Sequence, residues 1–326
     1  MKQAAGDPVI LAAVVNYRGV DLTLATVASL QALDADVPMT IIVIDSASGG
    51  SDLERLRSGL SPAVEIVALE TNRGYGAACN VAIGRACRSG IRYVWLLNND
   101  IEIEPDCHRR LAEALDQNPS LAAVAPTVVE YDHPDLILSC GMDVSLRRGR
   151  VRHRRMGRST AELPSGIEMV DALEASALLV RTSAAAACGG LDENFFMYWE
   201  DLEWSLRVRE QGWRLASAAQ ARIRHRVSQS STPRDRTEHM IRNRIRVVRL
   251  RGSRLDQLMF MGYMTFGWLP AYAIARMLFR HGPAATAKTI VRPVLWNIRD
   301  ARRRRHWRLT RSDQEIGTCE GPTTGS

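Results

Sequence analysis

The sequence predicts an α/β fold in which a mostly parallel sheet packs against helices. Its 326 residues are 46% hydrophobic and 24% charged, which is the composition of a folded globular protein. Short β-branched runs alternate with longer helical patterns from Val9 to Pro126. These runs are apolar throughout, as expected of strands that are buried on both faces of a parallel sheet.

The alternating elements of this region follow one another in a regular order. The predicted strands are VILAAVVN (9–16), TIIVID (40–45), VEIVAL (64–69), RYVWLLN (92–98) and LAAVAP (121–126). The predicted helices lie between them, at 21–34, 51–59, 75–88 and 105–117. Strands that are separated by helices in this way are typical of a parallel sheet.

The next hundred residues have a mixed pattern. The stretch 136–153 predicts turns and a hairpin, and 167–181 holds an apolar run that ends in ALLV before a Cys-Gly-Gly break. A helix is expected from Glu200 to Gln211, because its acidic first turn suits the positive end of a helix dipole and Gly212 supplies a stop signal. We therefore expect this half to be less regularly wound.

The C-terminal region predicts helices of a different character. The stretch from Leu258 to Phe279 has 22 residues with a single charge, Arg276. This length permits a membrane span, but Pro270, two glycines and the arginine favour a kinked or interfacial helix pair.

These patterns divide the chain into three predicted parts. We expect a catalytic domain at 1–235, a helical, hydrophobic and basic region that associates with a membrane at 236–311, and a disordered tail at 312–326.

The cysteines and the N-terminus indicate a cytoplasmic protein. The six cysteines are irregularly spaced and include no C-x-x-C pair, so a disulfide framework or a zinc site is not expected and a reducing compartment fits best. The first apolar run leads directly into Asn16, Tyr17 and Arg18 without a cleavage-site pattern. We therefore expect a buried first strand and no export signal.

The positive charge of the chain predicts an anionic partner. The net charge is +7, with eleven arginines between Arg222 and Arg254 and seven between Arg299 and Arg311. An apolar stretch beside such arginines favours anionic lipid headgroups over nucleic acid, which does not require an apolar surface. We therefore expect a peripheral position on the inner face of the cell membrane.

Polar side chains follow several of the predicted strands. They are Asn16, Tyr17, Asp45, Ser46, Asn72, Asn98, Asn99 and Asp100. Because ligands of open α/β sheets bind at the carboxyl ends of strands, these side chains are expected to share one crevice.

Two segments at these strand ends suggest a phosphate and metal site. In TNRGYGAACNVAI (71–83), small residues join a strand to a helix, where backbone N–H groups can approach a phosphate, although a plain structural turn is the alternative. In LLNNDIEIEP (96–105), Asp100 ends a strand and can hold Mg²⁺ or Mn²⁺ together with substrate phosphates. The alternative for Asp100 is a turn ahead of the next helix.

A third segment, FFMYWEDLEWSLRVREQGW (195–213), places acidic residues behind an aromatic entry. A carboxylate beside a hydrophobic wall is a reasonable general base, because burial raises its pKa, and an aromatic side chain can stack on a sugar. The alternative is that these acids are ordinary partners of a helix N-terminus.

The order and spacing of the three segments resemble family 2 glycosyltransferases, and most closely the rhamnosyltransferase-like branch. The resemblance covers roughly residues 9–250. It implies the GT-A nucleotide-diphospho-sugar transferase fold, a Rossmann-like mixed sheet. It also implies inverting transfer of a sugar from a nucleoside diphosphate donor to an acceptor hydroxyl, assisted by a divalent metal, Mg²⁺ or Mn²⁺.

The resemblance also implies roles for individual residues. Donor binding is implied for Asn16, Tyr17, Asp45, Ser46, Asn72, Gly74, Tyr75, Asn80 and Asn98. The family's D-x-D metal motif is similar to Asn98-Asn99-Asp100, with an amide at its first position, which implies Asp100 as a metal ligand and His225 as the later histidine beside it. The E-D motif matches Glu200 and Asp201, which implies Asp201 as the base and Trp199 and Glu200 as acceptor contacts.

The resemblance suggests the substrates only by class. A dTDP-linked sugar, dTDP-rhamnose first, is the expected donor, with UDP-linked sugars next, and the expected acceptor is a lipid-linked or polysaccharide glycan.

Two alternatives to the transferase remain. One is a non-catalytic, basic, membrane- or nucleic-acid-associated protein on the same fold, supported by RRRRHWR at 302–308. The other is a nucleotidyltransferase, for which the chain lacks a Gly-rich, lysine-bearing triphosphate loop.

Overall fold

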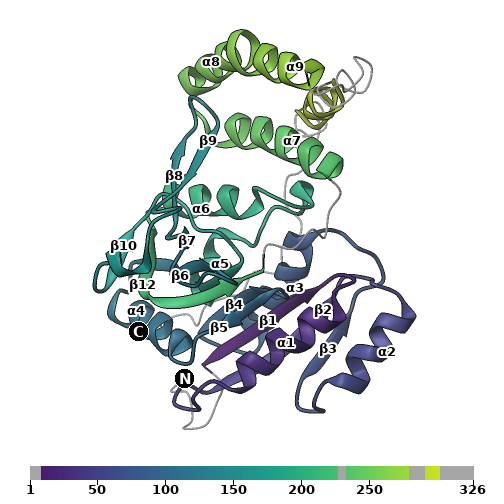
Figure 1. The fold of residues 1–326 in the computed structure, drawn as a ribbon, viewed down its shortest axis with the longest axis vertical. Helices are drawn as coiled ribbons and strands as arrows, with labels where there is room; N and C mark the ends of the chain where they lie inside the picture. Colours follow the sequence, from purple (N-terminus) through teal and green to yellow (C-terminus); the bar gives the residue numbers. More distant parts are fainter. Residues whose placement is uncertain (1–8, 227–232, 279–290, 302–326) are drawn as a thin grey trace, which may run out of the picture. The chain divides into compact units, whose positions relative to one another are not determined.

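Two compact units make up the chain in a computed structural model, which describes residues 9–226, 233–278 and 291–301 (Figure 1). The first unit contains residues up to 143, 152–196 and 200–226. The second contains 144–151, 197–199 and the described residues from 233 onward.

The first unit carries the sheet. Its strands are β1 (Ile10–Asn16), β2 (Met39–Asp45), β3 (Glu65–Ala68), β4 (Tyr93–Asn98), β5 (Ile101–Ile103), β6 (Leu121–Glu130), β7 (Ile137–Ser139), β10 (Ile167–Met169), β11 (Ala177–Arg181) and β12 (Arg214–His225). Its α-helices are α1 (Val20–Gln31), α2 (Gly50–Gly59), α3 (Tyr75–Arg88), α4 (Cys107–Gln117), α5 (Thr182–Cys188) and α6 (Glu200–Glu210), with short 3-10 helices η1 (Thr160–Glu162) and η2 (Glu193–Phe195). A hairpin of β8 (Met142–Ser145) and β9 (Arg150–His153) has its tip in the second unit.

The sheet is mixed but mostly parallel, as the sequence predicts. Its strand order is β10-β12-β6-β11-β4-β1-β2-β3, with β5 paired to β12 and β7 to β6. Strands β3, β2, β1 and β4 are parallel neighbours, and the antiparallel β11 lies between β4 and β6. The register places Asn16 opposite Asp45, and Val15 opposite Asn98. The polar residues after β1, β2 and β4 therefore lie along one edge.

Apolar side chains cover both faces of the sheet. One core cluster joins alternate residues of the central strands to α1, α2 and α4, and the other joins the remaining residues to α3, α5 and α6. The two clusters explain why the strand sequences are continuous apolar runs, because every second side chain faces a different helical layer.

The structure also contains strands that the sequence pattern does not predict. The strand β12 runs from Arg214 to His225 through RLASAAQARIRH, and β5 follows directly on the Asn-Asn-Asp turn. Alanine and arginine are strong helix formers, so the local composition of β12 conceals a strand that is stabilised by pairing with β6, β5 and β10.

The second unit is helical. It contains α7 (Pro233–Arg251), α8 (Arg254–Tyr263), the π-helical turn η3 (Met264–Trp268), α9 (Leu269–Leu278) and a helical segment at 291–301. A capping box between Ser253 and Asp256 starts α8. Within the described residues, no helix combines the length and apolar character needed to cross a membrane. The predicted kink is a π-turn, and residues 302–326, with the arginine run and the predicted disordered tail, lie outside the described residues.

Candidate active site

A buried polar cluster occupies the carboxyl ends of β1 and β2. Asn16 is fully buried and donates from Nδ2 to Asp45 Oδ1 at 2.7 Å and to Ser48 Oγ at 3.1 Å. Ser48 also donates to Asp45 Oδ1 at 2.6 Å. Asn16 Oδ1 accepts bonds from the Thr23 hydroxyl at 2.7 Å and from Asn99 Nδ2 at 3.3 Å. The Asn16 amide therefore links the first two strand ends to the Asn-Asn-Asp turn.

Two further residues predicted to bind the donor lie beside this cluster. Tyr17 is 37% exposed, and the Arg18 guanidinium lies 5.2 Å from the centre of its ring. Ser46 is buried, and its hydroxyl oxygen finds no hydrogen-bond partner within the described part of the chain. A buried hydroxyl without a partner is the exception in proteins, so Ser46 can accept a bond from a ligand.

The glycine-rich segment lies close to the backbone of Phe196 at the start of α3. Asn72 Oδ1 accepts a bond from the Gly74 amide at 2.9 Å, and Gly74 has a φ of +92°. A Cβ at Gly74 would lie 2.0 Å from the carbonyl oxygen of Phe196, to which the Tyr75 amide donates at 2.8 Å. The Tyr75 hydroxyl donates to Ala175 O at 2.6 Å. Only glycine permits this approach of two backbones.

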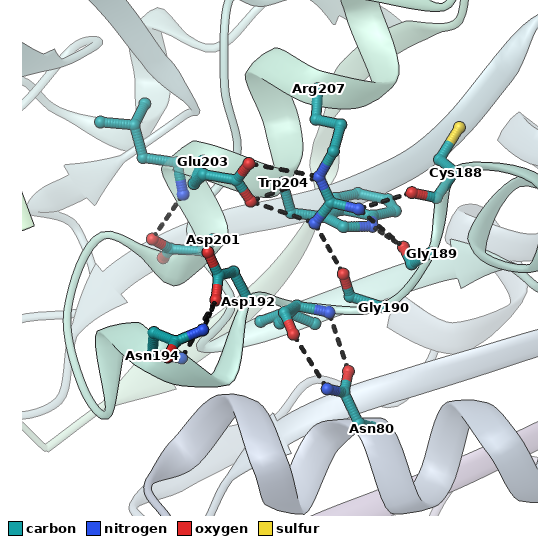
Figure 2. A network of polar contacts seen from close by, with 12 residues as sticks. Asn80, Cys188, Gly189, Gly190, Asp192, Asn194, Asp201, Glu203, Trp204 and Arg207 are labelled. Carbon is teal, nitrogen blue, oxygen red and sulfur yellow. Dashed lines mark hydrogen bonds and ion pairs between the residues drawn. The ribbon is translucent and has the colours of Figure 1, made fainter. Parts of the chain in front are cut away.

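Asn80 connects α3 to the loop after α5 (Figure 2). Its Nδ2 donates to Leu191 O at 2.9 Å and its Oδ1 accepts from Leu191 N at 2.8 Å, so the side chain pairs with both backbone groups of one residue. Nδ2 also lies 3.0 Å from Glu193 Oε1. These contacts give Asn80 a structural role, and its predicted donor contact stays a prediction.

An arginine on α6 holds the same loop from the other side (Figure 2). Arg207 donates to the carbonyl oxygens of Cys188, Gly189 and Gly190 at 2.5, 3.3 and 2.6 Å. Its charge is paired with the fully buried Glu203 at 3.0 Å. We call these contacts the Arg207 clamp. The clamp fixes the 188–190 loop against α6.

The predicted metal ligands meet at the ends of two distant segments. Asp100 and His225 are 125 residues apart in the chain, yet His225 Nε2 lies 3.1 Å from Asp100 Oδ1. Both are largely buried, and the Arg226 amide donates to Asp100 O at 2.9 Å. Burial alone would lower the pKa of His225, but the hydrogen bond and charge of Asp100 outweigh it, so the His225 pKa is raised above its ordinary value.

The segment just before β11 connects Asn98, the first residue of the Asn-Asn-Asp turn, with the predicted base Asp201. The backbone N–H of Asn98 donates to Ser176 O at 2.9 Å. The Ala175 amide donates to Asp201 Oδ2 at 3.1 Å, and the Leu202 amide donates to Asp201 Oδ1 at 2.7 Å. One short segment therefore connects the end of β4 with the start of α6.

Burial makes Asp201 an unusually basic carboxylate. Its pKa is raised to about 6: burial is the largest cause and the charge of Glu174 adds to the rise, while the two amide bonds and His153 act in the opposite direction. A carboxylate with this pKa is mostly ionised at pH 7 and is still a useful proton acceptor.

The two predicted acceptor contacts belong to different units. Glu200 is buried in the first turn of α6 in the first unit. Trp199 is half-buried in the second unit and has a φ of +74°. Positive φ is costly for a bulky residue and is concentrated at functional sites. In the second unit, Asn243 Nδ2 donates to the carbonyl oxygens of Met197 and Tyr198 just before Trp199.

Three residues of this edge, Ser48, Glu174 and His153, have no signal that singles them out in the sequence, whereas Asn99 is among the polar residues expected there. Ser48 and Asn99 complete the Asn16 cluster, and both stand inside the IDSAS and LLNND segments. Glu174 lies between β10 and β11 and His153 at the end of β9, in segments with no recognisable motif. Only the tertiary structure brings these last two towards Asp201.

The sequence matches a known family over the strands that form this edge. The model described as Glycosyl transferase family 2 matches residues 12–162, which include the Asn16 cluster, the glycine-rich segment and the Asn-Asn-Asp turn. This part of the chain matches glycosyltransferase family 2. The predicted family and the predicted class of enzyme, a glycosyltransferase, are both confirmed.

Relatives of this glycosyltransferase include enzymes from Mycobacterium tuberculosis. The chain is 29% identical over 227 residues to N-acetylglucosaminyl-diphospho-decaprenol L-rhamnosyltransferase, covering 64% of this chain and 73% of the relative. It is 27% identical over 221 residues to galactofuranosyltransferase GlfT1, covering 66% of this chain and 69% of the relative. The predicted resemblance to rhamnosyltransferases is thus confirmed by a named relative.

Solved structures confirm the GT-A fold of this glycosyltransferase. GalNAc-T7 with UDP, GalNAc and Mn²⁺ superimposes with a TM-score of 0.61 at 13% identity, covering 88% of this chain and 57% of that one. The mannosyltransferase PcManGT from Pyrobaculum calidifontis, in complex with GDP-Man and Mn²⁺, gives 0.53 at 14% identity, covering 88% and 80%. At these identities the likeness shows the fold alone.

Proposed function

We propose that this family 2 enzyme transfers a sugar from a nucleoside diphosphate donor to a hydroxyl of a lipid-linked or polysaccharide acceptor, with inversion at the anomeric carbon. The contact between Asp100 and His225 carries the proposal, because it places an oxygen and a nitrogen ligand at the sheet edge that also holds the Asn16 cluster. Ligands of open α/β sheets bind at this edge.

The Asp100 and His225 pair fits a divalent metal, Mg²⁺ or Mn²⁺. No group of three potential ligands occurs within the described residues, but metals in nucleotide sites commonly take one or two protein ligands and complete their shell with phosphate oxygens and water. A metal bound there would neutralise charge on the departing diphosphate. The chain's own part is to hold a carboxylate and an imidazole together and largely buried.

Asp201 is proposed as the general base. Two backbone amides fix both of its carboxylate oxygens, and its pKa, raised by burial to about 6, suits a proton acceptor near neutral pH. As the acceptor oxygen attacks the anomeric carbon, its proton passes to Asp201 and the bond to the diphosphate breaks. The nucleoside diphosphate leaves with the electron pair of the broken bond.

The donor-binding residues are proposed to line the edge from Asn16 to Asn98. The buried hydroxyl of Ser46 is available for a nucleotide, and the half-exposed ring of Tyr17 can stack on its base. The start of α3, with Asn72, Gly74, Tyr75 and Asn80, is proposed to lie beside the diphosphate, because helix N-termini attract phosphate.

L-rhamnose from dTDP-rhamnose is the proposed sugar and donor, with UDP-linked sugars next. Similarity to an enzyme named as an L-rhamnosyltransferase supports rhamnose, and that enzyme's name also supports a lipid-diphosphate-linked acceptor. Trp199 and Glu200 are proposed to contact this acceptor.

A thermal-shift and donor-hydrolysis screen tests the donor and the metal together. A panel of nucleotide sugars is added with and without Mn²⁺ or Mg²⁺, because a ligand of the folded state raises the melting temperature. Metal-dependent stabilisation by one donor is expected, and Asp100→Ala should abolish it. Glu113→Gln, an exposed acid on α4, is the control and should behave as wild type. A folded protein that no donor stabilises would contradict the proposal.

Substitution of the base separates binding from chemistry. Asp201→Asn should keep donor binding within about twofold and reduce transfer by at least 10²-fold, because a positioned base contributes typically 10²–10⁴-fold. Full turnover by Asp201→Asn would refute the assignment of the base.

We also propose that residues 236–311 dock on the inner face of a membrane while 1–235 form the catalytic domain. The support is a set of exposed apolar side chains in the second unit. They are Leu255, Leu258, Met261, Phe266 and Ile274, which are 54%, 71%, 57%, 86% and 58% exposed. Such side chains, accompanied by arginines, suit the surface of an anionic bilayer.

Vesicle sedimentation tests this partner. Phosphatidylglycerol vesicles should bind the protein at low salt, and phosphatidylcholine vesicles should bind it more weakly. Leu258→Ser with Phe266→Ser should release it, whereas Met156→Ser, an exposed methionine in the first unit, should not. Retention of a DNA duplex in place of vesicles would favour nucleic acid.

A further inference from the structure

The segment that holds the proposed base also carries an acidic side chain with no assigned role. In Leu173–Ser176, three of the four residues are buried and uncharged, and Glu174 is the exception. The Leu173 amide donates to Ser205 Oγ on α6 at 3.2 Å, and the Ala175 amide donates to Asp201 Oδ2 at 3.1 Å. The two residues that flank Glu174 thus each donate a backbone amide to α6, and this fixes the Glu174 backbone next to Asp201.

The same segment is anchored on its other side by the sheet and by α3. The carbonyl oxygen of Ala175 accepts a bond from the Tyr75 hydroxyl at 2.6 Å, and that of Ser176 accepts one from the backbone N–H of Asn98 at 2.9 Å. The backbone that carries Glu174 cannot move away from α6 without breaking several of these bonds. Glu174 is therefore a permanent neighbour of the base.

A histidine holds the Glu174 carboxylate from β9. His153 Nδ1 lies 3.6 Å from Glu174 Oε2 and 2.9 Å from Ser139 Oγ, and Ser139 is buried. The Glu174 side chain is 29% exposed and that of His153 is 37% exposed. The pair is thus oriented by the protein and partly shielded from solvent, so its charges are only partly screened.

We infer that Glu174 is a positioning residue for the transfer reaction: its carboxylate, fixed beside Asp201 and oriented by His153, makes Asp201 a stronger proton acceptor. The inference rests on the proposed role of Asp201 as base. A negative charge next to a carboxylate favours its protonated form, and a positive charge opposes this. Glu174 and His153 therefore act on Asp201 in opposite directions.

The direction of the pKa shift of Asp201 agrees with this arrangement. Burial raises it most, the charge of Glu174 raises it further, and His153 lowers it. Other titratable groups near Asp201 include Glu200, its neighbour on α6, and Tyr75 and Cys79 on α3, and the charge of Glu174 also raises the pKa of His225. Burial raises the pKa of Tyr75 and of Cys79, so both are neutral at working pH and add no charge.

Carboxylate NMR of the full chain tests the inference without any substrate. Protein with ¹³C-labelled aspartate is titrated from pH 4 to 9, and the Asp201 signal is assigned by its loss in Asp201→Asn. In Glu174→Gln the Asp201 midpoint should fall by about one pH unit. In Glu174→Asp, which keeps the charge, most of the shift should be restored. In His153→Asn the midpoint should rise.

The chain offers a closely matched control. Glu168 on β10 is also 29% exposed and also pairs with a cation, Arg155, at 2.9 Å. Glu168→Gln should leave the Asp201 midpoint unchanged. An unchanged midpoint in Glu174→Gln, in protein with the wild-type spectrum elsewhere, would overturn the inference, and so would an equal fall in Glu168→Gln.

The acid limb of the transfer rate supplies the kinetic readout. In Glu174→Gln the limb should move to lower pH by the same one unit, while the plateau rate falls several-fold because the base is weaker. A merely structural role would lower the rate equally at every pH. Full turnover by Asp201→Asn would instead refute the base itself, whatever the NMR titration shows, so the two failures are distinguishable.

Discussion

The Arg207 clamp should contribute more to stability than any exposed ion pair of the same helix. Arg207→Ala removes the donors to three carbonyl oxygens and the cation beside Glu203, whose side chain is 1% exposed. Removing one partner of a buried pair typically costs 3–5 kcal/mol. Because Arg207 is itself 16% exposed, we expect about 3 kcal/mol, the lower end of that range.

Urea unfolding followed by circular dichroism measures this loss, and thermal unfolding should show a fall in Tm of about 6–12 °C. Arg209→Ala is the matched control, because Arg209 lies on the same helix, is 40% exposed and pairs with Asp171 at 3.1 Å. It should cost less than about 1 kcal/mol. Arg207→Lys, which keeps the charge but loses the planar fork, should fall between the two. Equal losses in Arg207→Ala and Arg209→Ala would refute the reasoning.

Three further predictions concern the site and its frame. Gly74→Ala should destabilise the fold by about 2 kcal/mol or more in urea unfolding, because its Cβ would lie 2.0 Å from Phe196 O at a φ of +92°. Gly50→Ala is the control and should be tolerated, because a Cβ there meets nothing within 4 Å. Asp201 acts as a base only when ionised, so with a pKa raised to about 6 the transfer rate should fall tenfold per unit below pH 6 and level off above pH 7; a flat profile between pH 5 and 7 would contradict this. Trp204→Phe removes the indole bond at 3.0 Å and leaves a small cavity in the core, and should cost about 2 kcal/mol or more in the same unfolding assay.

The parallel half of the fold follows from the sequence because each strand carries its own signal. The predicted helix at 75–88 matches the structure at both ends, and the predicted strand ends at Asn16, Asp45 and Asn98 are those observed. These strands are buried between two helical layers, so their composition alone identifies them. The strand β12 has no such signal, because its pairing partners lie far away in the chain.

The candidate site divides in the same way. Asn16, Asp45, Gly74 and Asp100 stand at strand ends or turns, where sequence patterns indicate special chemistry or geometry. The proximity of Asp100 to His225 depends on β12, and no local pattern reports it. Glu174 is a single acid in an apolar segment, and its place beside Asp201 exists only after the sheet, α3 and α6 have assembled.

The contacts of Asn80 with Leu191 restrict which residue can occupy position 190. Asn80 uses both ends of its amide as a peptide group would, and a Cβ at Gly190 would lie 2.2 Å from Asn80 Oδ1. Gly190 is therefore constrained by a side chain on another helix. A lineage that replaced the asparagine with a smaller residue would release the glycine to vary, so the two positions should change together across homologous sequences.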